Sequence, residues 1–286
     1  MSLQFLQPET LAEALALLGR DPDENKIIAG GTAVVLMLQH KLIAPETLIS
    51  LSRIPGLNSI HLADDGLHIG SLALLREVAA SGMVQEHFPA LAYACEVVGN
   101  VRIRNQATLG GNMAEADYAS DPPAVLLALD ASVVATSAAR ARIIPLSEFF
   151  YGFYTTALEP DEIMTEVIVP ALPANCRMIY LKYKSRSSED RPCAGIAAMA
   201  AFDGLICTDL RVAVGAACET PRRLLEIEAL GIGQTLTDEL IQEIAEGYAA
   251  GIETLDDLRG SAWYRTQMIR VHVRRALKQI GAGRPC

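Results

Sequence analysis

Two pairs of consecutive glycines constrain this chain more than any other feature of its sequence. The first pair, Gly30-Gly31, follows Ile27-Ile28-Ala29 and precedes Thr32-Ala33-Val34, so a predicted strand turns directly into a predicted helix. Consecutive glycines permit positive φ angles and can turn successive backbone N–H groups toward one point. A helix that begins there adds the positive end of its dipole, which is typical of a diphosphate site. A plain tight turn is the alternative interpretation.

The second glycine pair lies in Thr108-Leu109-Gly110-Gly111-Asn112, inside a Gly- and Asn-rich stretch from Gly99 to Asp121 without regular periodicity. Long ordered loops in compact domains are usually functional. Two glycine pairs, each beside a threonine, predict loops that clamp one diphosphate from both sides. Asp121 precedes Pro122 at an expected helix start, so it is interpreted either as a helix cap or as a residue that binds ribose or amine hydrogens.

The hydrophobic pattern predicts an α+β fold with a helix-rich tail. Its N-terminal third alternates short strands and helices in a β-α-β-α-β unit, and Asp64-Asp65-Gly66 predicts a hairpin turn after it. The stretch from Pro170 to Asn175 is interpreted as a linker. Beyond it we expect strands over 178–183, 196–202 and 210–216, with a turn at Asp203-Gly204, and then helices over 221–230, 238–250 and 262–280.

Composition and missing motifs exclude several classes of protein. The 286 residues carry a net charge of −10, which argues against a nucleic-acid-binding surface. We expect a cytoplasmic protein, since the chain shows neither a signal peptide nor an apolar run near the ~18 residues of a membrane span. Its six cysteines form no C-x-x-C pair and no metal-ligand spacing, so we expect no metal site or iron–sulfur cluster in this chain.

Other familiar sites are missing too. The sequence contains no G-x-G-x-x-G, no P-loop, no H-E-x-x-H and no G-x-S-x-G motif. His61 and His68 lie near predicted strands without a carboxylate at metal spacing, and they are interpreted as ordinary hydrogen-bonded histidines. Residue chemistry alone therefore predicts a cytosolic α+β protein that binds a nucleotide-like anion.

The two glycine segments, taken together with Arg102-Ile103-Arg104-Asn105-Gln106-Ala107, resemble a known pattern. The chain resembles the FAD subunits of carbon monoxide dehydrogenase and related molybdenum hydroxylases, and the FAD domain of xanthine dehydrogenase. The resemblance covers essentially the whole chain in order, through 120–123, 153–156, 162–163, the series Lys182, Arg186 and Asp190, and 263–266.

This resemblance implies a fold. We expect a two-lobed FAD-binding domain of the vanillyl-alcohol-oxidase (PCMH) type over residues 1–172, with lobes of about 1–55 and 56–172. We expect a small α+β C-terminal domain over residues 176–286, with a three-stranded sheet and helices.

The resemblance also implies cofactor-binding residues. Residues 27–34 and 108–112 would hold the diphosphate of FAD, with Asp121 on the sugar or adenine side and Met164 as a further contact. Lys182 would lie near the pyrimidine edge, where a cation stabilises the negative charge that reduction builds at N1 and the C2 carbonyl. Thr32 stands where some flavoproteins carry a covalently attached histidine, so we expect noncovalent FAD.

Two segments depart from the family pattern. Arg191-Pro192 occupies the place of an aromatic or aliphatic residue that relatives hold against the ring, which leaves open what stacks there. The run from Glu115 to Asp117 is more acidic than the usual small residues, and no role is assigned to it.

The function implied by the resemblance is electron transfer within a complex. A large subunit would hold the molybdenum cofactor and hydroxylate the substrate, while a small subunit would hold two [2Fe–2S] clusters. The FAD of this chain would accept electrons from those clusters and pass them to an external acceptor. A dimer of heterotrimers is one possible assembly of the three subunits. Neither substrate nor acceptor follows from this sequence.

Three questions stay open at this point. A free-standing FAD-dependent oxidoreductase of the same fold would need a catalytic base, and Asp190 is better interpreted as structural. A nucleotide-binding module without redox activity is the other alternative. The basic residues of the C-terminal helix either form a solvated face or dock a neighbouring subunit. They are Arg265, Arg270, Arg274, Arg275 and Lys278.

Overall fold

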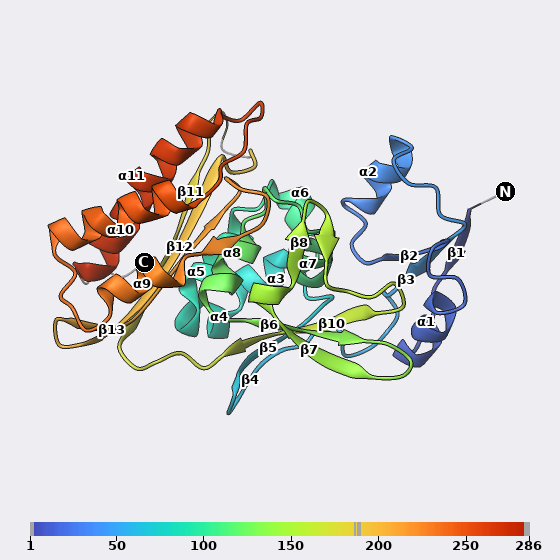
Figure 1. Cartoon of the computed structure of the whole chain (residues 1–286). Helices are drawn as coiled ribbons and strands as arrows, with labels where there is room; N and C mark the ends of the chain where they lie inside the picture. Colours follow the sequence, from blue (N-terminus) through green and yellow to red (C-terminus); the bar gives the residue numbers. More distant parts are fainter. Residues whose placement is uncertain (1–2, 186, 188–189, 283–286) are drawn as a thin grey trace.

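A small parallel sheet forms the N-terminal unit of the computed structural model, which describes residues 3–185, 187 and 190–282. Its strand order is β1-β3-β2, and the unit lies at one end of the molecule (Figure 1). Helix α1 starts where Thr10 accepts a hydrogen bond from the backbone of Glu13, and it buries Ala14, Leu15 and Leu18. The predicted β-α-β-α-β unit is therefore confirmed. Its elements are β1 (Gln4–Leu6), α1 (Leu11–Leu18), β2 (Asn25–Ile28), α2 (Val34–Gln39) and β3 (Thr47–Ser50).

Helix α2 is unusual because it is apolar yet buries none of its residues. It stands apart from the sheet of its own unit, on the side that faces the middle of the molecule (Figure 1). Val35 and Leu36 are both exposed. Helix α2 therefore gains little from packing within the chain.

A five-stranded antiparallel sheet forms the second unit, with strand order β4-β5-β10-β6-β7. Helices cover it, and Leu67, Val133 and Val167 from three neighbouring strands enter the same core as helical residues such as Leu91 and Leu126. The hairpin predicted at Asp64-Asp65-Gly66 joins β4 to β5. The elements are β4 (Ile60–Ala63), β5 (Gly66–Gly70), α3 (Leu75–Ala80), α4 (Gly82–His87), α5 (Pro89–Glu96), α6 (Val101–Arg104), α7 (Leu109–Glu115), α8 (Pro122–Ala128), β6 (Ser132–Thr136), β7 (Ala141–Pro145), η1 (Leu146–Glu148), β8 (Phe150–Gly152), β9 (Thr155–Thr156) and β10 (Ile163–Pro170).

The stretch expected to be irregular between Gly99 and Asp121 contains two short helices, α6 and α7, so that expectation was wrong. Asn100 accepts hydrogen bonds from the first amides of α6, and Thr108 accepts one from Gly111 in α7. These caps stabilise helices too short to show a periodic hydrophobic pattern. The second glycine pair consequently lies in the first turn of a helix rather than in a loop.

The C-terminal unit is a four-stranded sheet with order β11-β12-β13-β14, not the three strands expected. Strand β14 is only Arg222–Arg223, which is too short to leave a period in the sequence. Strand β12 is buried on both faces, because α10 and α11 cover one side and α8 of the second unit packs on the other (Figure 1). The elements are β11 (Cys176–Tyr183), β12 (Ala194–Asp203), β13 (Ile206–Gly215), β14 (Arg222–Arg223), α9 (Leu225–Glu228), η2 (Ala229–Gly231), α10 (Asp238–Gly251) and α11 (Ala262–Gly281).

The second unit and the C-terminal unit share one hydrophobic core where they meet. Met178, Tyr180 and Met199 from the C-terminal sheet belong to the same buried cluster as the helices of the second unit. Across the described ranges, no helix is long and apolar enough to pass through a membrane.

Candidate functional site

The two glycine pairs converge in space. An ideal Cβ placed on Gly30 would lie 1.8 Å from the carbonyl oxygen of Gln106, so the loop after β2 touches the backbone that leads into α7. A Cβ on Gly111 would lie 3.8 Å from the Cβ of Ala29. Gly31 has φ +73°, a conformation that favours glycine. Only glycine at position 30 permits this approach.

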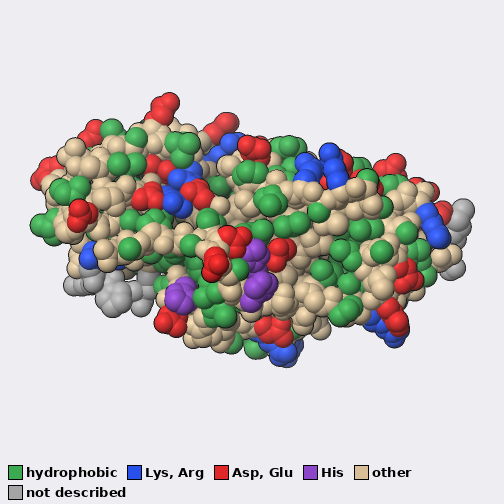
Figure 2. Space-filling view, turned by 90° about the horizontal axis from the view of Figure 1, so that it is seen from below, with side chains coloured by type: hydrophobic (Ala, Val, Ile, Leu, Met, Phe, Trp, Pro, Cys, Tyr) green, Lys and Arg blue, Asp and Glu red, His purple; other side chains and the backbone are tan. Residues whose placement is uncertain are grey.

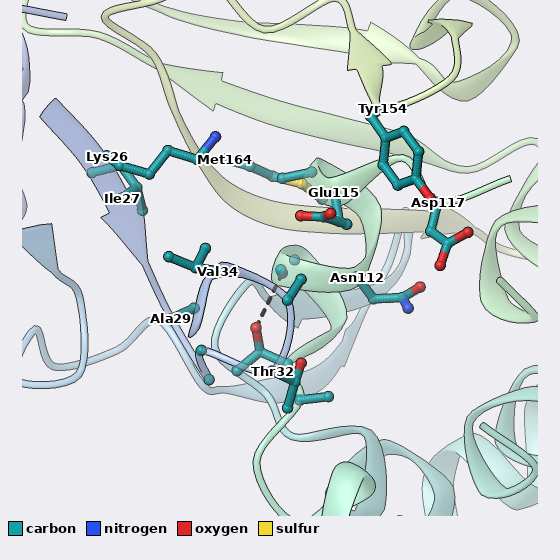
Figure 3. A pocket seen from close by; sticks show the side chains of 18 of the residues that line it. Lys26, Ile27, Ala29, Thr32, Val34, Asn112, Glu115, Asp117, Tyr154 and Met164 are labelled. Atoms are coloured by element: carbon teal, nitrogen blue, oxygen red, sulfur yellow. Dashed lines mark hydrogen bonds between the residues drawn. The ribbon is translucent and has the colours of Figure 1, made fainter. Parts of the chain in front are cut away.

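A cavity of about 1110 Å³ opens between the N-terminal unit and the second unit at this convergence. Lys26, Thr32 and Asn112 come to it from different elements (Figure 3). This volume exceeds the ~300–1,000 Å³ of ordinary small-molecule pockets, so it suits a ligand as long as a dinucleotide. Of the predicted site residues, those on its wall are Ile27, Ala29, Gly30, Gly31, Thr32, Ala33, Val34, Thr108, Gly110, Gly111, Asn112, Asp121, Met164 and Lys182. Ile28 and Leu109 are buried in the protein and do not line it.

The backbone amides of the two glycine segments differ in what they can bind. Within the described residues, the amides of Gly30 to Ala33 donate to no protein acceptor, so they remain for a ligand. Three amides of the second segment already have protein acceptors, because Leu109 donates to Ala73, Gly110 to Ser71 and Gly111 to Thr108. These hydrogen bonds do not support the expectation that the second glycine pair grips a diphosphate with its amides. Its glycines serve close packing, and a Cβ on Gly110 would lie 2.4 Å from the Cβ of Ser71.

Two polar side chains on the second segment's side of the cavity are still available. The buried hydroxyl of Ser71 has no hydrogen-bond partner within the described residues, and Ser71 lines the cavity. The side-chain oxygen of Asn112 accepts a hydrogen bond from Ser120 at 2.8 Å, which leaves its NH₂ group as a donor. The cavity thus offers donors from both sides, and this fits a phosphate-containing ligand.

Asp121 and Lys182 form a buried ion pair, with 2.8 Å between Lys182 Nζ and Asp121 Oδ2. The Lys182 ammonium also donates to the carbonyl of Val97 at 2.7 Å, and Tyr180 donates to the other carboxylate oxygen at 2.7 Å. Burial raises the pKa of Asp121 and lowers that of Lys182, while the contact between them opposes both shifts.

This pair corrects one sequence-based interpretation and bears on another. Asp121 precedes α8, but its side chain makes no capping hydrogen bond, so it is not a helix cap. The resemblance assigned Asp121 to the sugar or adenine side and Lys182 to the pyrimidine edge. Because the two charged groups are in direct contact, they act at one place on the cavity wall.

Sequence analysis missed several charged residues of the cavity. Lys26 extends into it opposite Glu115, whose carboxylate also faces the open space (Figure 3). Burial raises the pKa of Glu115. Asp117 is ion-paired with Arg191, which also lines the cavity. The acidic run from Glu115 to Asp117 was the sequence signal for these charged cavity residues. The cations near it, Lys26 and Arg191, come from distant segments of the chain. Arg186 lies outside the described residues.

Of the two histidines predicted to be ordinary, His68 is hydrogen-bonded, as expected. His68 contacts Asp65 at 2.9 Å and Glu166 at 3.2 Å, and His61 stacks on its ring. In Figure 2, which views the molecule from below, histidine side chains lie beside acidic ones. The sequence suggested no carboxylate near these histidines at metal spacing, but β10 brings Glu166 close. Even so, no set of three potential ligands in the described part of the chain is placed to hold a metal.

The basic C-terminal helix α11 is largely paired within the chain. Arg265 is fully buried and contacts Asp257 at 2.6 Å, so it is not available for docking. Arg270 pairs with Glu246 and Lys278 with Asp238, both on the neighbouring helix α10. The docking interpretation is therefore wrong for Arg265.

Comparison with known families identifies the fold. Residues 1–172 match the family described as the FAD binding domain in molybdopterin dehydrogenase, and residues 179–280 match the CO dehydrogenase flavoprotein C-terminal domain. The chain belongs to the FAD-binding family of molybdopterin dehydrogenases. It is thus a flavoprotein component of an oxidoreductase, and the predicted fold class is confirmed.

Individual relatives of this FAD-binding chain match along their full length. It is 31% identical over 276 residues to the glyceraldehyde dehydrogenase medium chain of Sulfolobus acidocaldarius, covering 96% of this chain and 97% of the relative. It is 34% identical over 286 residues to the 6-hydroxypseudooxynicotine dehydrogenase complex subunit alpha of Paenarthrobacter nicotinovorans, covering 99% and 96%. A carbon monoxide dehydrogenase structure from Hydrogenophaga pseudoflava superposes with a TM-score of 0.95 at 33% identity, covering 99% and 98%.

Proposed function

We propose that the chain is the FAD-carrying subunit of a molybdenum hydroxylase, and that its noncovalent FAD passes electrons from partner [2Fe–2S] clusters to an external acceptor. The convergence of Gly30 on the backbone at Gln106 carries the proposal. It makes one cavity from two distant segments, and the amides of Gly30 to Ala33 in its wall have no acceptor among the described residues.

The cavity residues have distinct roles in this proposal. The amides of Gly30 to Ala33 would donate to the diphosphate, and Asn112 and Ser71 would supply further donors. Lys182, paired with Asp121, would supply a cation in the cavity wall. FAD contributes one- and two-electron chemistry when bound. No residue of the cavity forms a covalent link in this assignment, because Thr32 replaces a nucleophilic histidine.

The proposed division of labour among subunits is supported by the relatives of this chain. In its described part, no set of His, Cys, Asp and Glu residues is arranged to hold a metal, and the five described cysteines are unpaired. Relatives include medium chains and subunits of dehydrogenase complexes. We therefore assign the molybdenum cofactor to a large partner subunit and the [2Fe–2S] clusters to a small one.

Purification of the chain alone tests cofactor binding. We expect a flavin absorption spectrum and about one FAD per chain, released into the supernatant when the protein is denatured, since noncovalent binding needs no bond cleavage. Absence of flavin would instead favour the nucleotide-binding module without redox activity. Flavin that stays with the precipitated protein would contradict noncovalent attachment.

Purification with the neighbouring subunits separates the complex from a free-standing flavoenzyme. We expect molybdenum and iron in the complex and neither metal in the chain alone. Substrate of the complex should reduce FAD in the assembled protein but not in the isolated chain. Substrate reduction of FAD by the isolated chain would overturn the electron-relay proposal.

A further inference from the structure

One face of strand β11 carries a charge arrangement that the function proposed above does not explain. Tyr180 and Lys182 are two residues apart on this strand, so their side chains point to the same side of the sheet. Both reach Asp121, Tyr180 through Oδ1 at 2.7 Å and Lys182 through Oδ2 at 2.8 Å. The carboxylate is therefore held at both oxygens.

The arrangement is buried and built into the packing. Asp121 and Tyr180 are each 2% exposed. Gly195, which pairs with Lys182 on the neighbouring strand, leaves room for the Tyr180 hydroxyl, because a Cβ there would lie 2.4 Å from it. Asp121 and Lys182 line the cavity, whereas Tyr180 lies behind them and does not.

The ammonium of Lys182 is held by two protein acceptors. An ammonium group has three donors, and here one goes to Asp121 and one to the carbonyl of Val97. The Lys182 side chain is only 1% exposed, so its ammonium lies just behind the cavity wall and acts on a ligand chiefly through its charge. A carboxylate 2.8 Å away also cancels most of the ammonium's charge as seen from the cavity.

We propose that Asp121 is a positioning residue for Lys182, with Tyr180 holding Asp121, and that this pairing sets the reduction potential of the bound cofactor. The inference rests on the proposed FAD function. A bare Lys182 would stabilise the negative charge of reduced FAD strongly. Asp121 weakens that effect, so the cofactor stays reducing enough to pass its electrons on.

A double-mutant cycle tests the coupling through the midpoint potential of the bound FAD. Asp121→Asn keeps the shape but removes the compensating charge, so the reduction equilibrium should favour reduced FAD at least tenfold, about 30 mV for two electrons. Lys182→Met should shift the potential in the negative direction. In the double variant, Asp121→Asn should change the potential little, because the buried Asp121 takes up a proton when Lys182 is absent and then carries no charge to remove.

Asp117 provides a matched control, since it is another cavity carboxylate but pairs with Arg191. The shift caused by Asp117→Asn should be the same with and without Lys182. Additive shifts of Asp121→Asn and Lys182→Met would overturn the proposal, and so would an unchanged potential in Asp121→Asn that retains FAD.

Tyr180→Phe covers the case in which Asp121→Asn loses FAD or fails to fold. It keeps the ring in the core and removes only the hydroxyl that shares the carboxylate's charge. The full charge then faces Lys182, so the potential should move in the negative direction. An unchanged potential with FAD retained would overturn the proposal. A wild-type chain without FAD would refute the proposed function itself, which is a separate outcome.

Discussion

Gly30 is the residue at which the cavity is most sensitive to side-chain size. Gly30→Ala would place a Cβ 1.8 Å from the Gln106 carbonyl, a backbone atom that cannot rotate away. We expect the free energy of unfolding to fall by about 1–3 kcal/mol, the usual cost of overpacking, and FAD to be lost. Urea unfolding and flavin content measure the two effects.

Gly82→Ala is the matched control for that variant. A Cβ at Gly82 meets no atom within 4 Å, so stability and flavin content should stay near the wild-type values. If Gly30→Ala retained full FAD content and stability, the close approach of the two segments would not be essential.

His68 links stability to pH at the residue scale. Its hydrogen bond to Asp65, with a second one to Glu166, raises the pKa of His68 above 6.5. The folded state thus favours the protonated ring. Its stabilising contribution is complete below pH 6.5 and is lost as pH rises through the higher folded-state value.

Unfolding measured at about pH 5.5 and about pH 8.5 checks this dependence. Wild type should lose stability with rising pH relative to His68→Gln, whereas the exposed His40→Gln variant should follow wild type. Parallel pH profiles of wild type and His68→Gln would contradict the assignment.

At the scale of elements, Glu228 joins its own helix α9 to three other elements of the C-terminal unit. Its buried carboxylate accepts hydrogen bonds from the Val212 amide of β13, from Tyr248 of α10 and from Arg223 of β14. Arg223 also pairs with Asp130 beyond α8. Short elements with little hydrophobic contact of their own are thereby held in place.

Glu228→Gln should lower the free energy of unfolding by about 3 kcal/mol, because it leaves the largely buried Arg223 without its main counter-charge. Chemical denaturation followed by circular dichroism measures the loss. Glu226→Gln, on the same short helix but exposed, should cost less than about 0.5 kcal/mol. Equal effects of both substitutions would argue against a structural network.

At the scale of the whole molecule, the second unit and the C-terminal unit depend on a common core. Helices α5 and α8 pack against the sheet through Tyr180, Ala197 and Met199, all of which are buried. Residues 1–172 alone would expose this apolar surface to water. We therefore expect that fragment to aggregate or to bind the hydrophobic dye ANS, unlike the full chain.

Gel filtration and dye binding, with the full chain measured in parallel, test this dependence. A monomeric fragment with a cooperative unfolding transition would show that the second unit is independently stable. That outcome would also mean that the shared core contributes little to the cavity wall at Asp121.

The sequence by itself determined the order of the larger elements and the positions of the two glycine pairs. Strand and helix periods are local, and Thr10, Gly19 and Pro122 end or start helices through their own chemistry. The resemblance covers essentially the full chain, and it added the expectation that the two glycine segments act together. Short elements such as β14 and α6 escaped prediction, because they depend on caps and neighbours rather than on a repeating pattern.

Only the tertiary structure decided which groups of the cavity are available to a ligand. The amides of the second glycine segment are consumed by Ser71 and Ala73, whereas those after Gly30 are not. Asp121 and Lys182 form an ion pair, although the resemblance implied contacts with different parts of FAD. Hydrogen bonds and ion pairs between residues distant in the chain depend on their positions in space, and residue spacing carries no information about them.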